Sequence, residues 1–385
     1  MLHLPTYKNT LAPYELRNNP LVPRTPQVAL TRTAFAAAHI VSDPLAERDP
    51  WDTRPAVDWD ATLQFRIGLW DQGLGLAEAM DTAQRGMGVD WDTAKELINR
   101  TMAAAKDHAM SPRVACGAGT DHIALEDLKS FAAIKGAYET QMSTIENAGG
   151  QVILMASRAF PAMNASSDEY HAVYRHLIDN AKDPVILHWL GDMFDPALSG
   201  YWGHRDVNSA SDFVLGLIAE NPEKVDGIKI SLLDKAHEES FRARLPDGVR
   251  LYTGDDFNYA DLIAGDGAHY SHALLGIFAA IAPAAAQALE AMSKEDMSTY
   301  LDPFRGLGLG FDAMFDALEA FDSLTPSRNN YPPYNLIRDG ENYTLEVALA
   351  GFKKEDIQVE LKENKLTVEN IRKDATENED YIHRG

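Results

Sequence analysis

The sequence predicts an α/β protein, a (β/α)8 TIM barrel followed by a partial all-β segment, and three observations indicate this. From about residue 29, short apolar runs alternate with helical patterns, which is typical of parallel strands joined by helices. The runs are continuously apolar, which predicts strands buried on both faces, and their number in about 250 residues fits a barrel better than an open sheet. After about residue 302 the pattern changes to period-two alternation, which predicts antiparallel hairpins. A Rossmann-type sheet is the main alternative, but the glycine-rich run GLGLGF at 306–311 follows no strand.

The elements are expected in a definite order. Residues 1–28 contain five prolines and are expected to form an irregular arm. The barrel domain spans 29–302, with strands over 29–41, 112–119, 150–157, 184–191, 226–231 and 249–256, weaker strands near 73–80 and over 268–275, and helices such as 168–182 and 209–224. An amphipathic arm follows over 303–328, including a helical pattern at 310–324, and an incomplete β domain over 329–385 has alternating runs at 343–352 and 357–370.

Composition excludes several classes of protein. Apolar residues make up 45% and charged residues 24% of the 385 residues, which is ordinary for a globular chain with a sizeable core. The net charge of −23 argues against nucleic-acid or acidic-membrane partners, because phosphates would be repelled. The single cysteine, Cys116, excludes an internal disulfide, and no apolar leader or membrane-length run is found, so a soluble cytoplasmic protein is expected.

One residue is unexpected in the apolar run VDGIKISLLD at 225–234. Lys229 lies at its centre, where an aliphatic side chain would be ordinary. In a barrel, inward-pointing residues near the C-terminal ends of the strands face the active site. A low dielectric there disfavours the ammonium ion, so the neutral amine can attack a carbonyl group and form a Schiff base. Alternatively, the lysine stem passes its apolar neighbours and the ammonium group reaches water at the strand end.

Five segments in order carry a resemblance to a known superfamily. They are VACGAGT (114–120), GGQVILMASRAF (149–160), PVILHWLG (184–191), DGIKISLLD (226–234) and RLYTGDD (250–256). Together they resemble the dihydrodipicolinate synthase and N-acetylneuraminate lyase superfamily of class I aldolase-type barrels over roughly residues 30–300. The resemblance implies that Lys229, on the sixth strand, forms the imine. It also implies a lyase or aldolase-type enzyme that acts on a small keto-acid-like or carboxylated metabolite and needs no cofactor.

The sequence departs from that superfamily in ways that suggest other site residues. Phe160 stands where the family has a proton-shuttling tyrosine, and Arg158 nearby is expected to bind an anionic group of the substrate. Trp189 replaces an asparagine, and His188 before it is expected to assist proton transfer. The family's Gly-Thr-Thr-Gly-Glu loop is replaced by GLAEAMDTAQRG (75–86), where Thr82 is expected to contact substrate. These departures predict a divergent branch of the superfamily.

Three alternatives stay open for the polar residues. The segment with Thr82 could equally be a solvated helix face, together with Glu78 and Asp81. Asp255 and Asp256 end the seventh strand, and one of them is expected either to contact substrate or to cap the next helix. A metal held by His188, Asp192 or His204 is conceivable, but the spacing matches no metal motif, so no metal is expected.

The C-terminal segment resembles a second family. The run NNYPPYNLIRDGENYTLEVALAGFKKEDIQVELKENKLTVEN (329–370) resembles the small heat-shock protein, or α-crystallin, family, and FRGLGLGFDAMFDAL (304–318) resembles its amphipathic arm. The second half of that β-sandwich is missing after YIHRG (381–385), so the sequence looks like a fusion of two incomplete proteins. The resemblance implies, as an alternative function, a chaperone or oligomerisation module that contacts unfolded clients, and a homo-oligomer is expected. A barrel that binds a metabolite without turnover is a third hypothesis.

Overall fold

The computed structural model describes residues 2–5, 11–14, 23, 25–47, 54–81, 85, 88–301, 334–339, 342–347, 357–362 and 365–370. The chain divides into two compact units, residues 1–310 and 311–385, which are described separately here. The predicted helix at 310–324 lies outside the described residues.

The first unit contains a closed barrel of eight parallel strands in the order β10-β3-β4-β5-β6-β7-β8-β9. Closure confirms the predicted TIM barrel and rules out the open Rossmann-type sheet. All eight predicted strands are present, including the two weaker ones. Their bounds are β3 (Ala34–Ala37), β4 (Gly75–Glu78), β5 (Val114–Ala118), β6 (Gln151–Leu154), β7 (Val185–Leu190), β8 (Val225–Ser231), β9 (Arg250–Thr253) and β10 (His272–Leu275).

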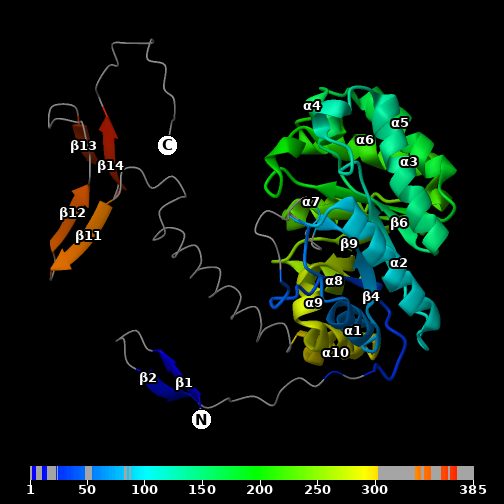
Figure 1. Cartoon of the computed structure of the whole chain (residues 1–385), viewed down its shortest axis with the longest axis horizontal. Coiled ribbons are helices and arrows are strands. Elements are labelled where there is room, and N and C mark those ends of the chain that lie inside the picture. The colour runs from blue at the N-terminus through cyan, green and yellow to red at the C-terminus, as the bar shows by residue number, and fades with distance from the viewer. Residues whose placement is uncertain are drawn as a thin grey trace. The chain divides into compact units, whose positions relative to one another are not determined.

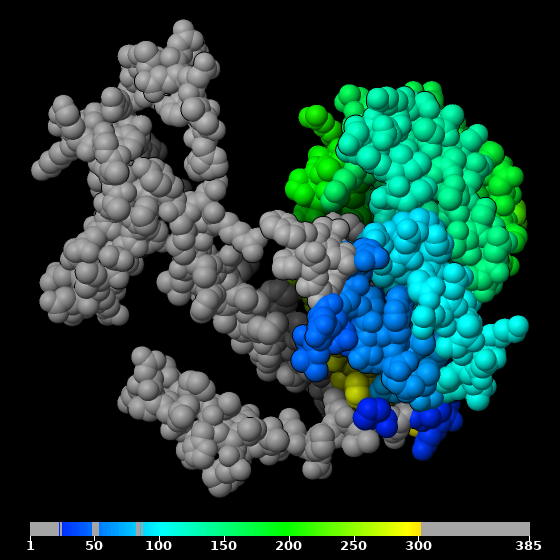
Figure 2. Space-filling model, viewed as in Figure 1, coloured from blue at the N-terminus to red at the C-terminus, as the bar shows by residue number. Residues whose placement is uncertain are grey.

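Helices connect successive strands and surround the barrel (Figure 1). In the space-filling view, segments coloured from blue through cyan to green form a continuous outer surface (Figure 2). The longer helices are α1 (Trp59–Trp70), α2 (Trp91–Asp107), α3 (Phe131–Ala148), α5 (Ser167–Asn180), α6 (Val207–Glu220), α7 (Lys235–Arg242), α8 (Tyr259–Ala264) and α10 (Ala282–Ser293). The shorter elements are α4 (Ala159–Ala162), α9 (Ile277–Ala280) and the 3₁₀ turns η2 (Leu125–Asp127), η3 (Pro196–Leu198), η4 (Tyr201–Gly203) and η5 (Pro222–Lys224).

Local sequence explains where these helices begin and end. Six of them start directly after an Asp or Ser whose side-chain oxygen accepts a backbone N–H of the first turn: Asp58, Asp90, Ser130, Ser166, Asp206 and Asp234. The cap Ser166 belongs to a full capping box with Glu169. Helix α3 ends at Gly149, whose φ of 88° is accessible mainly to glycine, and α6 ends before Pro222.

The hydrophobic core has two layers, separated by the barrel wall. Inside the barrel, a small cluster includes Phe35, Ile153, Ile186, Tyr252 and Leu274. The larger layer lies between the strands and the helices, because alternate strand residues point outward. Because both faces of each strand are buried, the strand register is fixed: a shift by one residue would move the inward-facing side chains to the outer face and the outward-facing ones into the barrel.

A buried ion pair joins α1 to the end of β4. Arg66 and Glu78 are fully buried, and two hydrogen bonds of 2.7 and 2.9 Å connect the guanidinium to the carboxylate. Thr101 of α2 donates a third bond to the same carboxylate. The alternative of a solvated helix face is therefore wrong for Glu78, because its charge is satisfied inside the protein.

Three two-stranded sheets lie outside the barrel. Strands β1 (Leu2–Pro5) and β2 (Leu11–Tyr14) pair antiparallel, where the sequence predicted an irregular arm. Proline does not prevent this, because both strands of a two-stranded sheet are edge strands. In the second unit β11 (Tyr334–Asp339) pairs with β12 (Asn342–Val347), and β13 (Ile357–Lys362) with β14 (Lys365–Asn370). Antiparallel hairpins were predicted there, although β11 was not.

Candidate active site

The N-terminal end of the barrel is closed by a charged cluster and a large ring. Asp226, at the start of β8, accepts hydrogen bonds from Arg113, Arg250 and the hydroxyl of Tyr252. The Tyr252 ring lies so close to Gly227 that a Cβ there would meet it at 2.7 Å. A site inside the barrel is therefore reached from the opposite, C-terminal end, where barrel enzymes carry their active sites.

Lys229 lies inside the barrel, in the middle of β8. It shares a strand face with Gly227, two residues earlier, while Ile228 and Ile230 point outward into the layer under the helices. Only 6% of the Lys229 surface is exposed, and within the described structure its amine makes no hydrogen bond or ion pair. The alternative of an ammonium group that reaches bulk water is therefore not supported by its burial.

Gly254, just after β9, makes room for this lysine. A Cβ at Gly254 would lie 2.8 Å from Cε of Lys229 and 2.1 Å from Oγ of Ser231. Only a residue without a side chain fits between them.

His188 is the neighbour of Lys229 on β7, and the two Cα atoms are register partners. The imidazole is 2% exposed, and its Nε2 is buried without a hydrogen-bond partner. Burial and the positive charge of Lys229 lower the pKa of His188 to about 3, although the Asp81 carboxylate acts in the opposite direction. At neutral pH His188 is therefore an uncharged imidazole beside the amine.

Two carboxylates, from the loops after two other strands of the barrel, complete the cluster. Asp81 follows β4, Asp256 follows β9, and both lie within electrostatic reach of Lys229 or of His188. Burial raises the pKa of Asp256, as do the charges of Asp255 and Asp81, while Lys229 opposes this rise. The Oδ1 atom of Asp256 is buried and has no hydrogen-bond partner in the described structure. We call Lys229, His188, Asp81 and Asp256 the mouth cluster.

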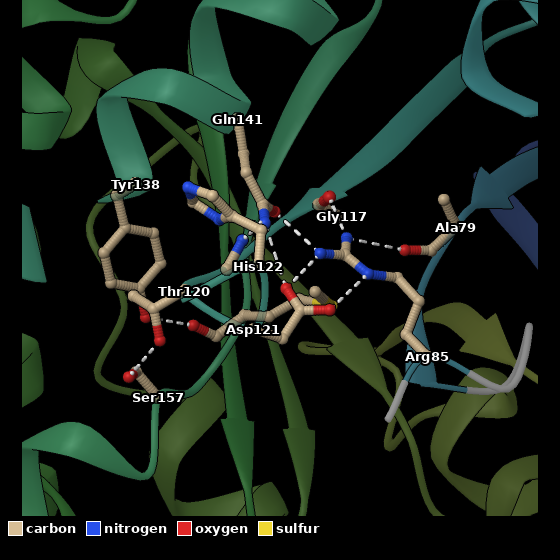
Figure 3. Close-up of polar contacts among 11 residues, drawn as sticks. Ala79, Arg85, Gly117, Thr120, Asp121, His122, Tyr138, Gln141 and Ser157 are labelled. Atoms are coloured by element: carbon tan, nitrogen blue, oxygen red, sulfur yellow. Dashed lines mark hydrogen bonds and ion pairs between the residues drawn. The ribbon is translucent and has the colours of Figure 1, made fainter. Parts of the chain in front are cut away.

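Arg85 holds the loop that carries Asp81. Its guanidinium donates to the backbone oxygens of Ala79 and Gly117, at 3.1 and 2.7 Å, and pairs with Asp121. Gln141 accepts from Arg85 at 2.7 Å, and Figure 3 shows these side chains converging on the guanidinium. Burial raises the pKa of Asp121, but the charge and hydrogen bonds of Arg85 outweigh this and lower it overall. Strands β4 and β5 are thereby linked just below the mouth cluster.

Two of the other predicted site residues, Arg158 and Phe160, are engaged with partners of their own. Arg158 is exposed, with 61% of its side chain accessible, and pairs with Asp195 at 2.6 Å. Phe160 is fully buried in α4 and stacks on Tyr170 at a ring distance of 4.4 Å. Phe160 therefore belongs to an aromatic cluster of the outer layer.

Trp189 and Asp255 likewise make contacts that stabilise the fold. Trp189 follows His188 and points to the opposite face of β7, where its ring lies 5.6 Å from that of His237. The Asp255 carboxylate accepts the backbone N–H groups of Phe257 and Asn258, at 2.8 and 2.9 Å, and so stabilises the turn before α8; it does not cap that helix, whose N-cap is Asn258. Thr82 lies outside the described residues.

The sequence named Asp81 and Asp256 only among open alternatives, Asp81 beside Thr82 and Asp256 beside Asp255. Each follows the last residue of a strand, Glu78 of β4 or Thr253 of β9, by a short stretch of loop, and that position was the available signal. Among the described residues, no group of three or more His, Cys, Asp or Glu is arranged to hold a metal ion. No helix in the described part of the chain has the length and apolar character needed to span a bilayer.

The chain matches two protein families. The family described as "Protein of unknown function (DUF993)" matches residues 2–308, and the Hsp20/alpha crystallin family matches residues 335–385. Small heat shock protein HspD of Bradyrhizobium diazoefficiens is 40% identical over 78 residues, which are 20% of this chain and 50% of that protein. HspH of the same organism is 36% identical over 91 residues, 23% of this chain and 58% of that protein. The chain thus spans only about half of these curated relatives.

Solved structures resemble the barrel. Dihydrodipicolinate synthase from Aquifex aeolicus is 11% identical, with a TM-score of 0.55 over 74% of this chain and 83% of that one. The enzyme from Acinetobacter baumannii, in complex with pyruvate, is 14% identical, with a TM-score of 0.54 over 74% and 84%. At these identities the likeness establishes the fold alone. Both resemblances predicted from the sequence are confirmed, that of the barrel at the level of its fold and that of the C-terminal segment by the family match.

Proposed function

The chain belongs to the family described as protein of unknown function DUF993, and from its mouth cluster we propose a lyase of the aldolase type that forms an imine between Lys229 and a small carbonyl metabolite. The position of the Lys229 amine supports this most directly. It is enclosed by the barrel, unpaired within the described structure, and adjacent to groups that can exchange protons. A buried lysine in such surroundings is a known form of activated nucleophile.

The mouth cluster supplies what imine formation requires. The amine attacks the carbonyl carbon, a proton moves to the carbonyl oxygen, and water leaves as the imine forms. His188 is uncharged at neutral pH, so its buried imidazole can accept a proton from the attacking amine. Asp256, whose pKa is raised, can take up a proton during the attack and pass it to the departing oxygen. In the lyase direction, the protonated imine takes up the electron pair of the breaking bond, and a proton from the same groups then reaches the carbanion carbon.

Reduction with borohydride tests the proposal. The full chain is incubated with a panel of carbonyl compounds that includes pyruvate, the ligand of the Acinetobacter baumannii enzyme, and peptides are mapped by mass. We expect one adduct on Lys229 that is absent from Lys229→Met. The matched control is Lys235→Met, because Lys235 is 37% exposed and paired with Asp261, and it should leave the adduct unchanged. An enzyme that gives no Lys229 adduct with any carbonyl of the panel would contradict the proposal and favour a binding barrel without turnover.

The C-terminal match supports a second candidate function. We propose that residues 335–385 bind unfolding client proteins and promote self-association, because they match the Hsp20/alpha crystallin family. Val359 and Val368 are register partners in the β13–β14 hairpin, and proline cannot supply a strand N–H. We expect the full chain to suppress aggregation of a heated client and Val368→Pro to lose this effect while keeping the Lys229 adduct. Equal suppression by both chains, or none by either, would remove this function.

A further inference from the structure

We infer that the carbonyl compound taken by Lys229 is an uncharged hydroxy-aldehyde or hydroxy-ketone, and not a keto acid. This inference rests on the imine chemistry proposed above and concerns the substrate class of the same site. It replaces the keto-acid expectation drawn from the sequence, and it follows from the charges and hydrogen-bonding groups of the mouth cluster.

The mouth cluster has one cation and two carboxylates. Lys229 supplies the only cation of the cluster, as the ammonium ion before it loses a proton to react and as the protonated imine afterwards, and Asp81 and Asp256 carry negative charges from the loops after β4 and β9. His188 contributes an uncharged imidazole at neutral pH. A substrate carboxylate next to the reacting carbon would face both aspartates in a partly buried site, where like charges repel strongly.

The nearby guanidinium groups are already engaged. Arg85 donates to two backbone oxygens, Asp121 and Gln141, and Arg66 is paired with Glu78. Arg158 is exposed and bound to Asp195. Each of these three groups already has an acidic partner of its own and is therefore not available to pair with a substrate carboxylate at the Lys229 amine.

The buried polar atoms of the cluster that lack partners favour a ligand with hydrogen-bond donors. The buried Oδ1 of Asp256 has no hydrogen-bond partner in the described structure, and an ionised carboxylate only accepts hydrogen bonds. The buried Nε2 of His188 is also unpartnered. Hydroxyl groups on a ligand can donate to the carboxylate oxygen and either donate to or accept from the imidazole, whereas a ligand carboxylate brings further acceptors.

The test is competitive reductive trapping with dihydroxyacetone and pyruvate on the full chain. Adducts on Lys229 are counted by peptide mass mapping and normalised to those on the exposed Lys235, which corrects for the intrinsic reactivity of each compound. We expect dihydroxyacetone to label Lys229 at least about tenfold faster than pyruvate, as expected for like charges a few ångströms apart. Asp256→Asn removes one negative charge at nearly constant shape, and it should reduce the ratio of the dihydroxyacetone rate to the pyruvate rate at Lys229.

The outcomes separate this inference from the proposed function. Faster labelling of Lys229 by pyruvate, or equal labelling by both compounds, overturns the substrate class and leaves the imine chemistry standing. A ratio unchanged in Asp256→Asn also overturns the charge argument. Absence of a Lys229 adduct from every carbonyl tested overturns both.

Discussion

Replacing Gly254 with alanine should displace Lys229 and lower the stability of the barrel. The new Cβ would lie 2.1 Å from Oγ of Ser231, 2.8 Å from Cε of Lys229 and 2.9 Å from the backbone oxygen of Ile230. The two side chains can rotate away, but the backbone oxygen belongs to β8 and cannot move without disturbing the ladder. Overpacking of this kind costs about 1–3 kcal/mol of unfolding free energy.

Gly254→Ala should also slow borohydride trapping of Lys229, and by more than the loss of stability accounts for. Because Cε must move, the amine leaves its position beside His188, and a displacement of about 1 Å can reduce a rate on the order of a hundredfold. The assays are urea unfolding followed by tryptophan fluorescence and the rate of the borohydride-trapped adduct. Adding Ser231→Gly to Gly254→Ala removes the shortest contact and should recover part of the stability.

Gly216 provides the matched control. It lies in α6, and a Cβ there would meet nothing within 4 Å. Gly216→Ala should leave trapping unchanged and raise the unfolding free energy by about 0.5–1 kcal/mol, because alanine favours the helix. The reasoning is refuted if Gly254→Ala is as stable as the parent chain and is labelled at the same rate.

The remaining predictions concern the buried charges. Arg66→Met should lower the unfolding free energy in urea by about 3–5 kcal/mol, because it leaves Glu78 charged and buried, and Arg66→Met with Glu78→Met should recover much of the loss. Burial raises the pKa of Glu238 to about 7 in the folded state, so its contribution to stability is present below the unfolded value near 4.5 and is lost as the pH rises through 7. The unfolding free energy of the parent relative to Glu238→Gln should therefore fall between pH 5 and 8 by on the order of 3 kcal/mol. Lys229→Met should raise the pKa of His188, measured by NMR titration, because it removes a cation that lowers it.

Each of these three predictions has a control at an exposed residue of the same chain. Arg100→Met breaks an exposed pair with Glu96 and should change the unfolding free energy by less than about 1 kcal/mol. Glu239→Gln, beside Glu238 but 41% exposed at its side chain, should leave the pH dependence in place. The NMR titration of the exposed His171 should not respond to Lys229→Met. The first prediction is contradicted if Arg66→Met lowers the unfolding free energy no more than Arg100→Met does. The second is contradicted if the unfolding free energy of Glu238→Gln depends on pH in the same way as that of the parent chain. The third is contradicted if the pKa of His188 is the same in Lys229→Met.

The two-residue alternation and the continuous apolar runs are local properties, so the sequence by itself determined the strands, the barrel class and the position of Lys229 on β8. It also indicated His188 as its neighbour, since consecutive barrel strands lie side by side. The loops after β4 and β9, which bring Asp81 and Asp256 to the lysine, are far apart in the chain, and only closure of the ring decides that they meet. Closure and strand register also place Trp189 on the outer face and Phe160 in an aromatic cluster under the helices, while the backbone hydrogen bonds of Asp255 depend on how its loop folds. Residue type and order along the chain therefore identified the reactive amine, and packing in three dimensions selected the charges around it.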